Sequence, residues 1–149
     1  MRTVALDSSL WLNRPRALLF AFFADPANLE IITPAWLRFE MTTKRPFEMR
    51  QGTLIDYRLR LHGIPLRWRS EIKIWDPPHR FVDDQVRGPY RLWRHEHRFT
   101  EKDGGTEIQD HVDYAVPGGL LVEKLIVAGD VARIFEFRRK KLSEIFSRP

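Results

Sequence analysis

The 149-residue chain contains no cysteine, which excludes disulfide bonds and catalysis by a thiolate. A chain without disulfides suits a reducing compartment, so we expect a cytoplasmic protein. No uninterrupted apolar run approaches the roughly 20 residues that a membrane-spanning helix needs. The opening segment, Met-Arg-Thr-Val-Ala-Leu-Asp, places charges too early for the apolar stretch of a secretory signal. The sequence therefore predicts no integral membrane association.

Internal repeats, linkers and low-complexity segments are also absent, so we expect residues 1–149 to form a single domain. Hydrophobic residues make up 43% of the chain and charged residues 30%, a balance typical of a globular protein rather than a disordered one. A chain of this length can bury a core large enough to fold alone.

The net charge of +5 comes from 25 Lys and Arg against 20 Asp and Glu. The basic residues are scattered, except for the run Arg138-Arg139-Lys140-Lys141. Such a run is usually the solvated face of a helix. No nucleic-acid-binding motif accompanies the charge, so we expect no nucleic-acid partner. Attraction of this run to an anionic membrane surface stays open as an alternative.

The spacing of apolar residues changes along the chain and predicts an α+β fold. Residues 3–12 can form a first strand, and the signals at Asn13 to Pro15 and at Asp25-Pro26 start two short helices. Turn residues then divide the middle of the chain into short strands that pair as antiparallel hairpins. The strands predicted there are 36–43, 53–61, 65–75, 80–86, 91–100 and 106–115. With the first strand they make a seven-stranded antiparallel sheet.

A long helix is predicted from about Leu120 to Phe146, after the break at Pro117-Gly118-Gly119. At 1.5 Å per residue this helix would be roughly 40 Å long, enough to cross a small domain. Its apolar stripe should cover the inward face of the sheet. The predicted stripe consists of Leu121, Leu125, Ala128, Ala132, Phe135, Leu142 and Phe146.

The segment 91–99, Arg-Leu-Trp-Arg-His-Glu-His-Arg-Phe, carries the clearest functional signal. Alternate side chains of a strand point to opposite faces, so Trp93, His95, His97 and Phe99 share one face. The opposite face is mostly charged and belongs in water. Two imidazoles therefore point into an apolar interior, where a buried polar group costs free energy unless it is hydrogen-bonded. This pattern favours a lined cavity over a solid core.

Neighbouring strands add polar residues to the same inward face. Asp110 alternates with apolar residues in 106–114, and Asp83 and Gln85 share a face with Phe81. Mostly apolar walls with a few placed polar groups are typical of ligand pockets. The predicted cavity lining is Tyr57, Leu59, Trp68, Asp83, Gln85, Trp93, His95, His97, Phe99, Asp110, Leu125 and Phe135.

Three interpretations of His95, His97 and Asp110 stay open. In the first, Asp110 accepts a hydrogen bond from an imidazole and the network ties adjacent strands together. In the second, these residues recognise a carbonyl, hydroxyl or carboxylate group of a ligand. The third is acid–base catalysis or metal binding. Since His-x-His is a short, common spacing and no further His or Cys motif supports zinc, we expect neither a metal nor a cofactor.

The order of these elements, with Asp-Pro-Ala-Asn-Leu at 25–29, resembles the START-like or Bet v 1-like superfamily, also called SRPBCC. Bacterial members of that group have a similar pattern to Ile64-Pro65-Leu66-x-Trp68, Phe81-x-Asp83-x-Gln85-x-x-Gly88-Pro89-Tyr90-x-x-Trp93-x-His95-x-His97-x-Phe99 and Gly105-Thr106-x-x-x-Asp110. The resemblance covers nearly the whole chain. It implies a helix-grip fold, in which a curved sheet wraps around the C-terminal helix and leaves a hydrophobic tunnel that the two short helices gate.

Members of this superfamily bind lipids, sterols, hormones or polyketides, and some are cyclases or dehydratases. No catalytic motif of those enzymes is matched here residue by residue. We therefore expect a small hydrophobic ligand (lipid-, polyketide- or aromatic-like) between the sheet and the C-terminal helix, with Leu29, Ile32 and Trp36 flanking the entrance. The alternative is a cyclase or dehydratase in which His95 or His97 abstracts a proton beside a carbonyl and Asp110 orients the ring.

Overall fold

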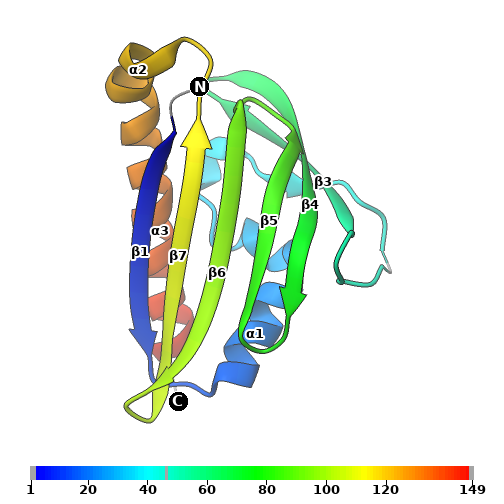
Figure 1. The fold of residues 1–149 in the computed structure, drawn as a ribbon, viewed down its shortest axis with the longest axis vertical. Coiled ribbons are helices and arrows are strands. Elements are labelled where there is room, and N and C mark those ends of the chain that lie inside the picture. The colour runs from blue at the N-terminus through cyan, green and yellow to red at the C-terminus, as the bar shows by residue number, and fades with distance from the viewer. Residues whose placement is uncertain (1–2, 46, 148–149) are drawn as a thin grey trace.

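The computed structural model describes residues 3–45 and 47–147, which form one curved antiparallel sheet with helices against its concave face (Figure 1). The strands lie in the order β1-β7-β6-β5-β4-β3-β2. They are β1 (Val4–Leu12), β2 (Glu40–Met41), β3 (Leu54–Leu61), β4 (Ile64–Asp76), β5 (Arg80–Arg87), β6 (Leu92–Lys102) and β7 (Gly105–Ala115). The predicted seven-stranded α+β fold is confirmed.

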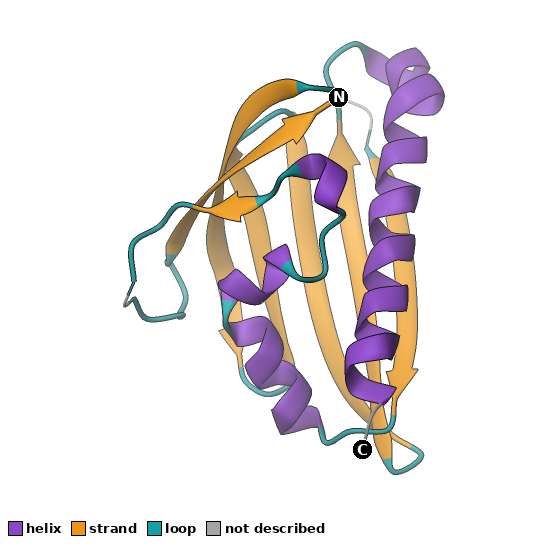
Figure 2. Cartoon of the chain, turned by 180° about the vertical axis from the view of Figure 1, so that it is seen from behind, coloured by secondary structure: helices purple, strands orange, loops and turns teal. Residues whose placement is uncertain are grey.

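The helical segments precede and follow the main strands. They are α1 (Arg16–Ala24), the 3-10 turns η1 (Pro26–Glu30) and η2 (Ala35–Leu37), α2 (Gly119–Val122), the π-helical turn η3 (Glu123–Val127) and α3 (Ala128–Ser147). Figure 2 looks onto the helical side, where α3 runs along the β1–β7 part of the sheet and α1 with its two turns covers the other part. No helix within the described residues is both long and apolar enough to span a lipid bilayer.

Two tight hairpins show why the strand boundaries were predictable. His62 and Gly63 join β3 to β4 with φ values of 51° and 79°, and Asp103 and Gly104 join β6 to β7 with φ values of 50° and 77°. Two successive residues with positive φ are the mark of the type I′ turn, whose twist matches that of the flanking strands. The pairing register follows from these turns, since Leu61 faces Ile64 and Lys102 faces Gly105.

The predicted strand at 36–43 is mostly wrong. Residues 35–37 form the turn η2, and Arg38, with a φ of 46°, changes the direction of the chain. Within the segment, Glu40 and Met41 pair with β3. Pro34, the residue before the turn, has extended backbone angles, and the chain leaves this conformation at Ala35, where the 3-10 turn begins.

The C-terminal helical region runs from 119 to 147 as predicted, but its buried stripe differs. Val131, Phe135 and Leu142 are buried, whereas Leu121 is 69% exposed and Ala132 also faces solvent. The π-helical turn η3 adds one residue to a helical turn, so residues before it are rotated relative to the stripe of α3. Leu125 lies in η3, and its side chain is outside the described part of the structure.

The apolar core consists of three groups of buried residues around the concave face. The first joins α1 to the sheet through residues such as Leu19, Phe20 and Phe99. The second joins α3 to β7 through Val112 and Val131, and the third lies on β3 and β4. Because these groups surround rather than fill the concave face, a space is left between them.

Candidate functional site

The space between the three core groups is a cavity of about 150 Å³. Its wall is formed by the segment from α1 to η2, by strands β3 to β6 and by α3. Most of the wall is aromatic or aliphatic. The polar side chains that border it are Thr33, Ser70, Asp83, His95, His97 and Arg138. Apolar walls with a few polar side chains are also common in ligand pockets.

Strand β6 positions the two histidines as its alternation predicts. His95 and His97 are both 4% exposed and point to the concave face, while Arg94 and Arg98 on the opposite face reach solvent. Trp93 precedes them on the same face. The regular pairing of β6 with β7 and β5 therefore fixes both imidazoles inside the molecule.

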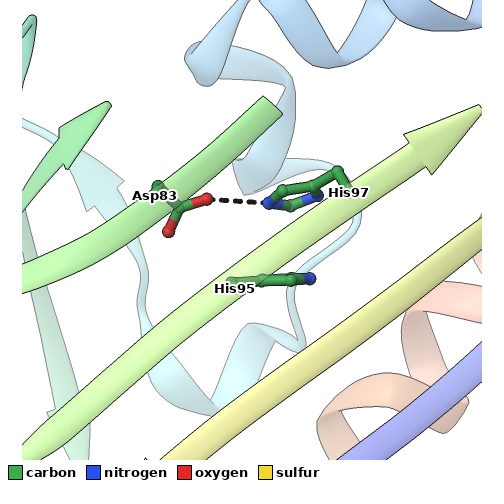
Figure 3. Close-up of side chains that lie close together, drawn as sticks. All are labelled: Asp83, His95 and His97. Atoms are coloured by element: carbon green, nitrogen blue, oxygen red, sulfur yellow. Dashed lines mark hydrogen bonds and ion pairs between the residues drawn. The ribbon is translucent and has the colours of Figure 1, made fainter. Parts of the chain in front are cut away.

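Each imidazole is bound to a carboxylate of a neighbouring strand. Figure 3 shows His97 bonded to Asp83 of β5. The distance from His97 Nε2 to Asp83 Oδ2 is 2.7 Å, and His95 Nε2 likewise lies 2.7 Å from Asp110 Oδ1 on β7. An ionised carboxylate can only accept, so the imidazole N–H donates in both bonds. Both bonds are diagonal, since His95 is directly opposite Asp83 and His97 is directly opposite Asp110 in the strand register.

The rings of Phe81, His97 and His95 form a stack across the concave face. The centroids of the two imidazoles are 3.7 Å apart with an angle of 24° between the planes. Phe81 covers the other face of His97 at 4.0 Å and 13°. With both rings held by stacking and by a carboxylate, the side chains have one fixed orientation.

Burial and hydrogen bonding act in opposite directions on this group. Burial, aided by the neighbouring His97, lowers the pKa of His95 to about 4 despite the hydrogen bond to Asp110. Burial acts to raise the pKa of Asp110, but the hydrogen bond from His95 and nearby positive charge outweigh it and hold the pKa at about 2. Burial likewise acts to raise the pKa of Asp83, but the hydrogen bond from His97 and nearby positive charge together outweigh it and lower the pKa. Near neutral pH, His95 is therefore neutral while both carboxylates are ionised.

Seven of the residues predicted to line the cavity border it: Tyr57, Leu59, Trp68, Asp83, Trp93, His95 and His97. Asp110 does not border it, because it lies behind His95 and accepts the hydrogen bond of that ring. Phe99 and Phe135 are buried in the core groups of α1 and α3 instead. Leu125 cannot be placed, since its side chain is outside the described region.

Gln85 also lies away from the cavity wall. Its side-chain amide donates to the carbonyl oxygen of Tyr90 at 2.7 Å, and its side-chain oxygen accepts from the Tyr90 N–H at 3.0 Å. Gln85 thus holds the connection between β5 and β6 in place. This connection places the Tyr90 ring against the cavity. Strand alternation indicated the face of Gln85 but not that a local backbone partner would capture its amide.

The residues predicted at the entrance have three different positions. Leu29 borders the cavity. Ile32 is fully buried in the core group of α1, and Trp36 is an exposed residue of the turn η2 that does not border the cavity. Leu37 and Phe39, which follow Trp36, take part in the wall instead.

Arg138 is the polar residue of the cavity that the sequence interpretation missed. It belongs to the basic run assigned to solvent, yet its side chain is only 11% exposed and borders the cavity. Its nearest carboxylate oxygen is Asp110 Oδ1, at 3.6 Å from Nη1. A signal was present in the helical spacing, because Arg138 follows Phe135 by three residues and precedes Leu142 by four.

Asp83, His95 and His97 could together offer ligands to a metal, since one potential ligand atom of each lies within 4.8 Å of the other two. A metal ion requires lone pairs that converge on one point. Here the imidazoles stack face to face, and both Nε2 atoms already donate to carboxylates. The guanidinium of Arg138 adds positive charge beside the same group. The geometry favours a hydrogen-bonded network over a metal centre.

Comparison with known proteins gives one family and several similar folds. The model of a family described as polyketide cyclase / dehydrase and lipid transport matches residues 12–137. No curated protein has a matching sequence.

Among solved structures, a protein from Rhodobacter sphaeroides is 24% identical with a TM-score of 0.69, over 96% of this chain and 92% of that chain. Major latex-like protein 151 from Panax ginseng is 12% identical with a TM-score of 0.72, over 97% of both chains. A protein from Chromobacterium violaceum is 11% identical with a TM-score of 0.76, over 97% of this chain and 98% of that chain. At these identities the likeness describes the fold alone.

Proposed function

Because the chain belongs to the polyketide cyclase / dehydrase and lipid transport family, we propose that it binds a small hydrophobic molecule in the cavity between the sheet and α3. The fold is the helix grip of Bet v 1-like proteins, as the resemblance to that superfamily implied. Fold alone does not define an activity, so the proposal rests on the cavity itself.

The observation that carries the proposal is a space with apolar walls and buried polar groups on one side. Trp68, Tyr90 and Trp93 form one part of the wall, and their rings contact one another at tilted or edge-on angles. An apolar molecule that enters this space leaves water for contacts with aromatic surfaces, which is favourable. The polar groups then fix its orientation.

A cyclase or dehydratase activity has less support. A general base works best when its pKa lies near the working pH. Burial lowers the pKa of His95 to about 4, which makes this imidazole a weak base at neutral pH. An imidazole with so low a pKa suits a binding wall better than a residue that takes and returns protons.

The proposal is tested by filling the cavity. In Leu59→Trp, a bulky ring replaces a side chain of the wall, so the affinity for toluene, followed by NMR titration, should fall at least about tenfold as its site is occupied. Leu54→Trp is the matched control, because Leu54 lies on the same strand but is exposed on the outer face. The control should bind toluene as the unchanged protein does. Equal binding by both variants, or no binding of toluene to the unchanged protein, would contradict the proposal.

A further inference from the structure

Arg138 has no hydrogen-bond partner for its buried donors. A guanidinium has five N–H donors and no acceptor. Nε and Nη1 are inaccessible to solvent, and neither has an acceptor among residues 3–45 and 47–147. Asp110 Oδ1 is too far from Nη1 for a hydrogen bond, and that oxygen already accepts from His95 at 2.7 Å.

Other contacts of Arg138 do not compensate for these unpaired donors. The guanidinium carbon lies 5.1 Å from the centre of the Phe135 ring, which is a favourable but modest cation–π contact. Buried donors without partners are rare in folded proteins and cost free energy. Since the Arg138 side chain borders the cavity, a small shift of its guanidinium brings these donors to an oxygen of a bound molecule.

The cavity limits the size of that molecule. A space of about 150 Å³ holds roughly one benzene ring. Trp68, Tyr90 and Trp93 surround part of it with ring faces and edges, and Phe23 and Phe81 complete the wall near the histidines. Aromatic walls of this kind favour a flat aromatic ligand through offset and edge-to-face contacts.

The charges beside Arg138 favour a neutral over an anionic oxygen as the group of the ligand that accepts from it. Asp83 and Asp110 are both ionised at neutral pH, and Arg138 is the guanidinium beside them. A third carboxylate placed near these two would meet their repulsion. A carbonyl oxygen accepts a hydrogen bond without bringing a charge.

Building on the proposed function, we infer that the ligand is a compact aromatic carbonyl compound whose oxygen accepts a hydrogen bond from Arg138. The ring lies among the aromatic residues of the wall, and the carbonyl points toward α3. The inference names the class of ligand and assigns Arg138 as the residue that selects it.

Acetophenone and α-methylstyrene test this directly, because they have nearly the same shape and differ in C=O against C=CH₂. Calorimetric titration of the unchanged protein should give at least about tenfold tighter binding of acetophenone, as expected of a hydrogen bond to a charged donor. Benzoate should bind more weakly than acetophenone. In Arg138→Met the preference for acetophenone should disappear, whereas Lys140→Met, which removes an exposed charge from the same helix, should retain it.

Infrared spectroscopy supplies a measurement that does not depend on a variant. The carbonyl stretch of ¹³C-labelled acetophenone bound to the unchanged protein should lie at lower frequency than in an alkane solvent, because a hydrogen bond from a guanidinium weakens the C=O bond. An unshifted band would overturn the inference even if Arg138→Met fails to fold.

The remaining outcomes separate this inference from the proposed function. If α-methylstyrene binds as tightly as acetophenone, or benzoate binds more tightly than both, the inference is wrong and the proposed cavity function stands. If none of the three compounds binds, both are wrong. Retention of the preference by Arg138→Met also overturns the inference, because Arg138 would then not be the donor.

Discussion

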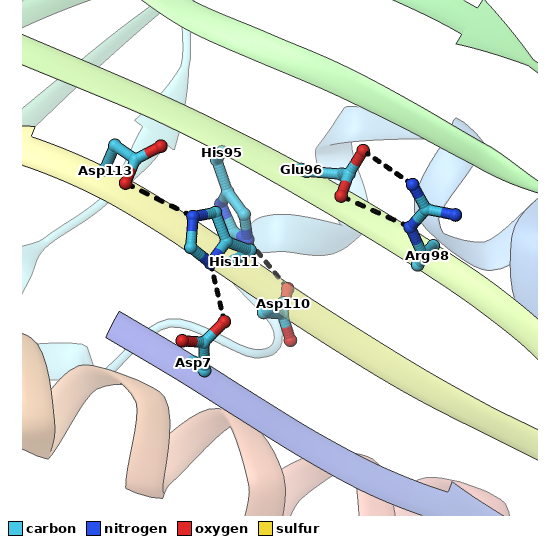
Figure 4. Close-up of polar contacts among 7 residues, drawn as sticks. All are labelled: Asp7, His95, Glu96, Arg98, Asp110, His111 and Asp113. Atoms are coloured by element: carbon cyan, nitrogen blue, oxygen red, sulfur yellow. Dashed lines mark hydrogen bonds and ion pairs between the residues drawn. The ribbon is translucent and has the colours of Figure 1, made fainter. Parts of the chain in front are cut away.

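The two faces of the sheet both pair histidines with aspartates, yet burial gives the pairs opposite properties. On the concave face, His95 is bound to Asp110 and is almost fully buried. On the convex face, His111 binds Asp7 at 2.6 Å and Asp113 at 3.2 Å, and its side chain is 42% exposed (Figure 4). The same two residue types therefore occur in a dry and a wet environment on adjacent strands.

The pKa values of the two histidines show the effect of this difference in burial. Burial lowers the pKa of His95 to about 4, whereas the hydrogen bond with Asp7 raises the pKa of His111 above its usual range. An aspartate partner is thus insufficient to keep an imidazole charged. On the concave face, burial changes the imidazole pKa more than the aspartate does. On the convex face, burial is slight and the aspartate has the larger effect on the pKa.

Removing the aspartate partner from each face should give the largest difference. Asp110→Ala leaves the His95 N–H without its acceptor and removes the carboxylate nearest to Arg138, so the free energy of unfolding should fall by about 3–5 kcal/mol. Asp7→Ala removes a partner whose side chain is 74% exposed, and the loss should stay below about 1 kcal/mol. Urea unfolding of both variants measures this. Similar losses in the two variants would mean that the buried network contributes no more than a surface pair.

The two histidines should also make opposite contributions to the pH dependence of stability. The pKa of His95 is about 4 in the folded protein and about 6.5 in an unfolded chain, so below pH 6.5 the unfolded state binds the proton first. Stability should therefore fall as the pH decreases from 6.5 to 4, by about 3 kcal/mol from this residue. Asp83 and Asp110 have lowered pKa values and lose their contribution only below about 3.9, outside that window.

His111 acts in the opposite direction, since its raised pKa gives stability at low pH that is lost as the pH rises. Urea unfolding at intervals from about pH 8 to pH 4 should show a flatter decline below about pH 6.5 in His95→Gln. In His111→Gln it should show a smaller gain in stability as the pH falls from about 8 to about 6.5. The slope is the readout, because either substitution also changes stability at neutral pH. An unchanged slope in His95→Gln would contradict the assignment.

Strand patterns were sufficient to predict the fold and the inward histidines. Alternation in β6 depends on local geometry alone, and the His62-Gly63 and Asp103-Gly104 turns fix where the hairpins reverse. Alternation gives the face of a residue but not its depth. For that reason Phe99 was assigned to the cavity, although it packs into the core between α1 and the sheet.

The features that escaped prediction depend on contacts between distant segments. The diagonal bond between His95 and Asp110 follows from the register of β6 and β7, which places Asp110 behind the ring rather than beside the cavity. Arg138 was missed because a charge within a basic run suggests solvent, and because the predicted helix stripe included Ala132 instead of Val131. The burial of a charge by the opposite sheet cannot be inferred from the helix alone.

Zinc should have the smallest effect of these tests, because we expect neither the concave nor the convex group of histidines and aspartates to bind it. Asp83, His95 and His97 come close enough to share an ion, but the stacked rings and the two carboxylate bonds would have to rearrange first. The melting temperature of the protein should therefore be the same with zinc chloride and with EDTA. A rise with zinc that disappears in His97→Gln but persists in His111→Gln would mean that the concave network opens readily into a metal site. That result would reverse the interpretation of the stack as a rigid wall, because rings that rotate to meet an ion could also rotate to meet a ligand.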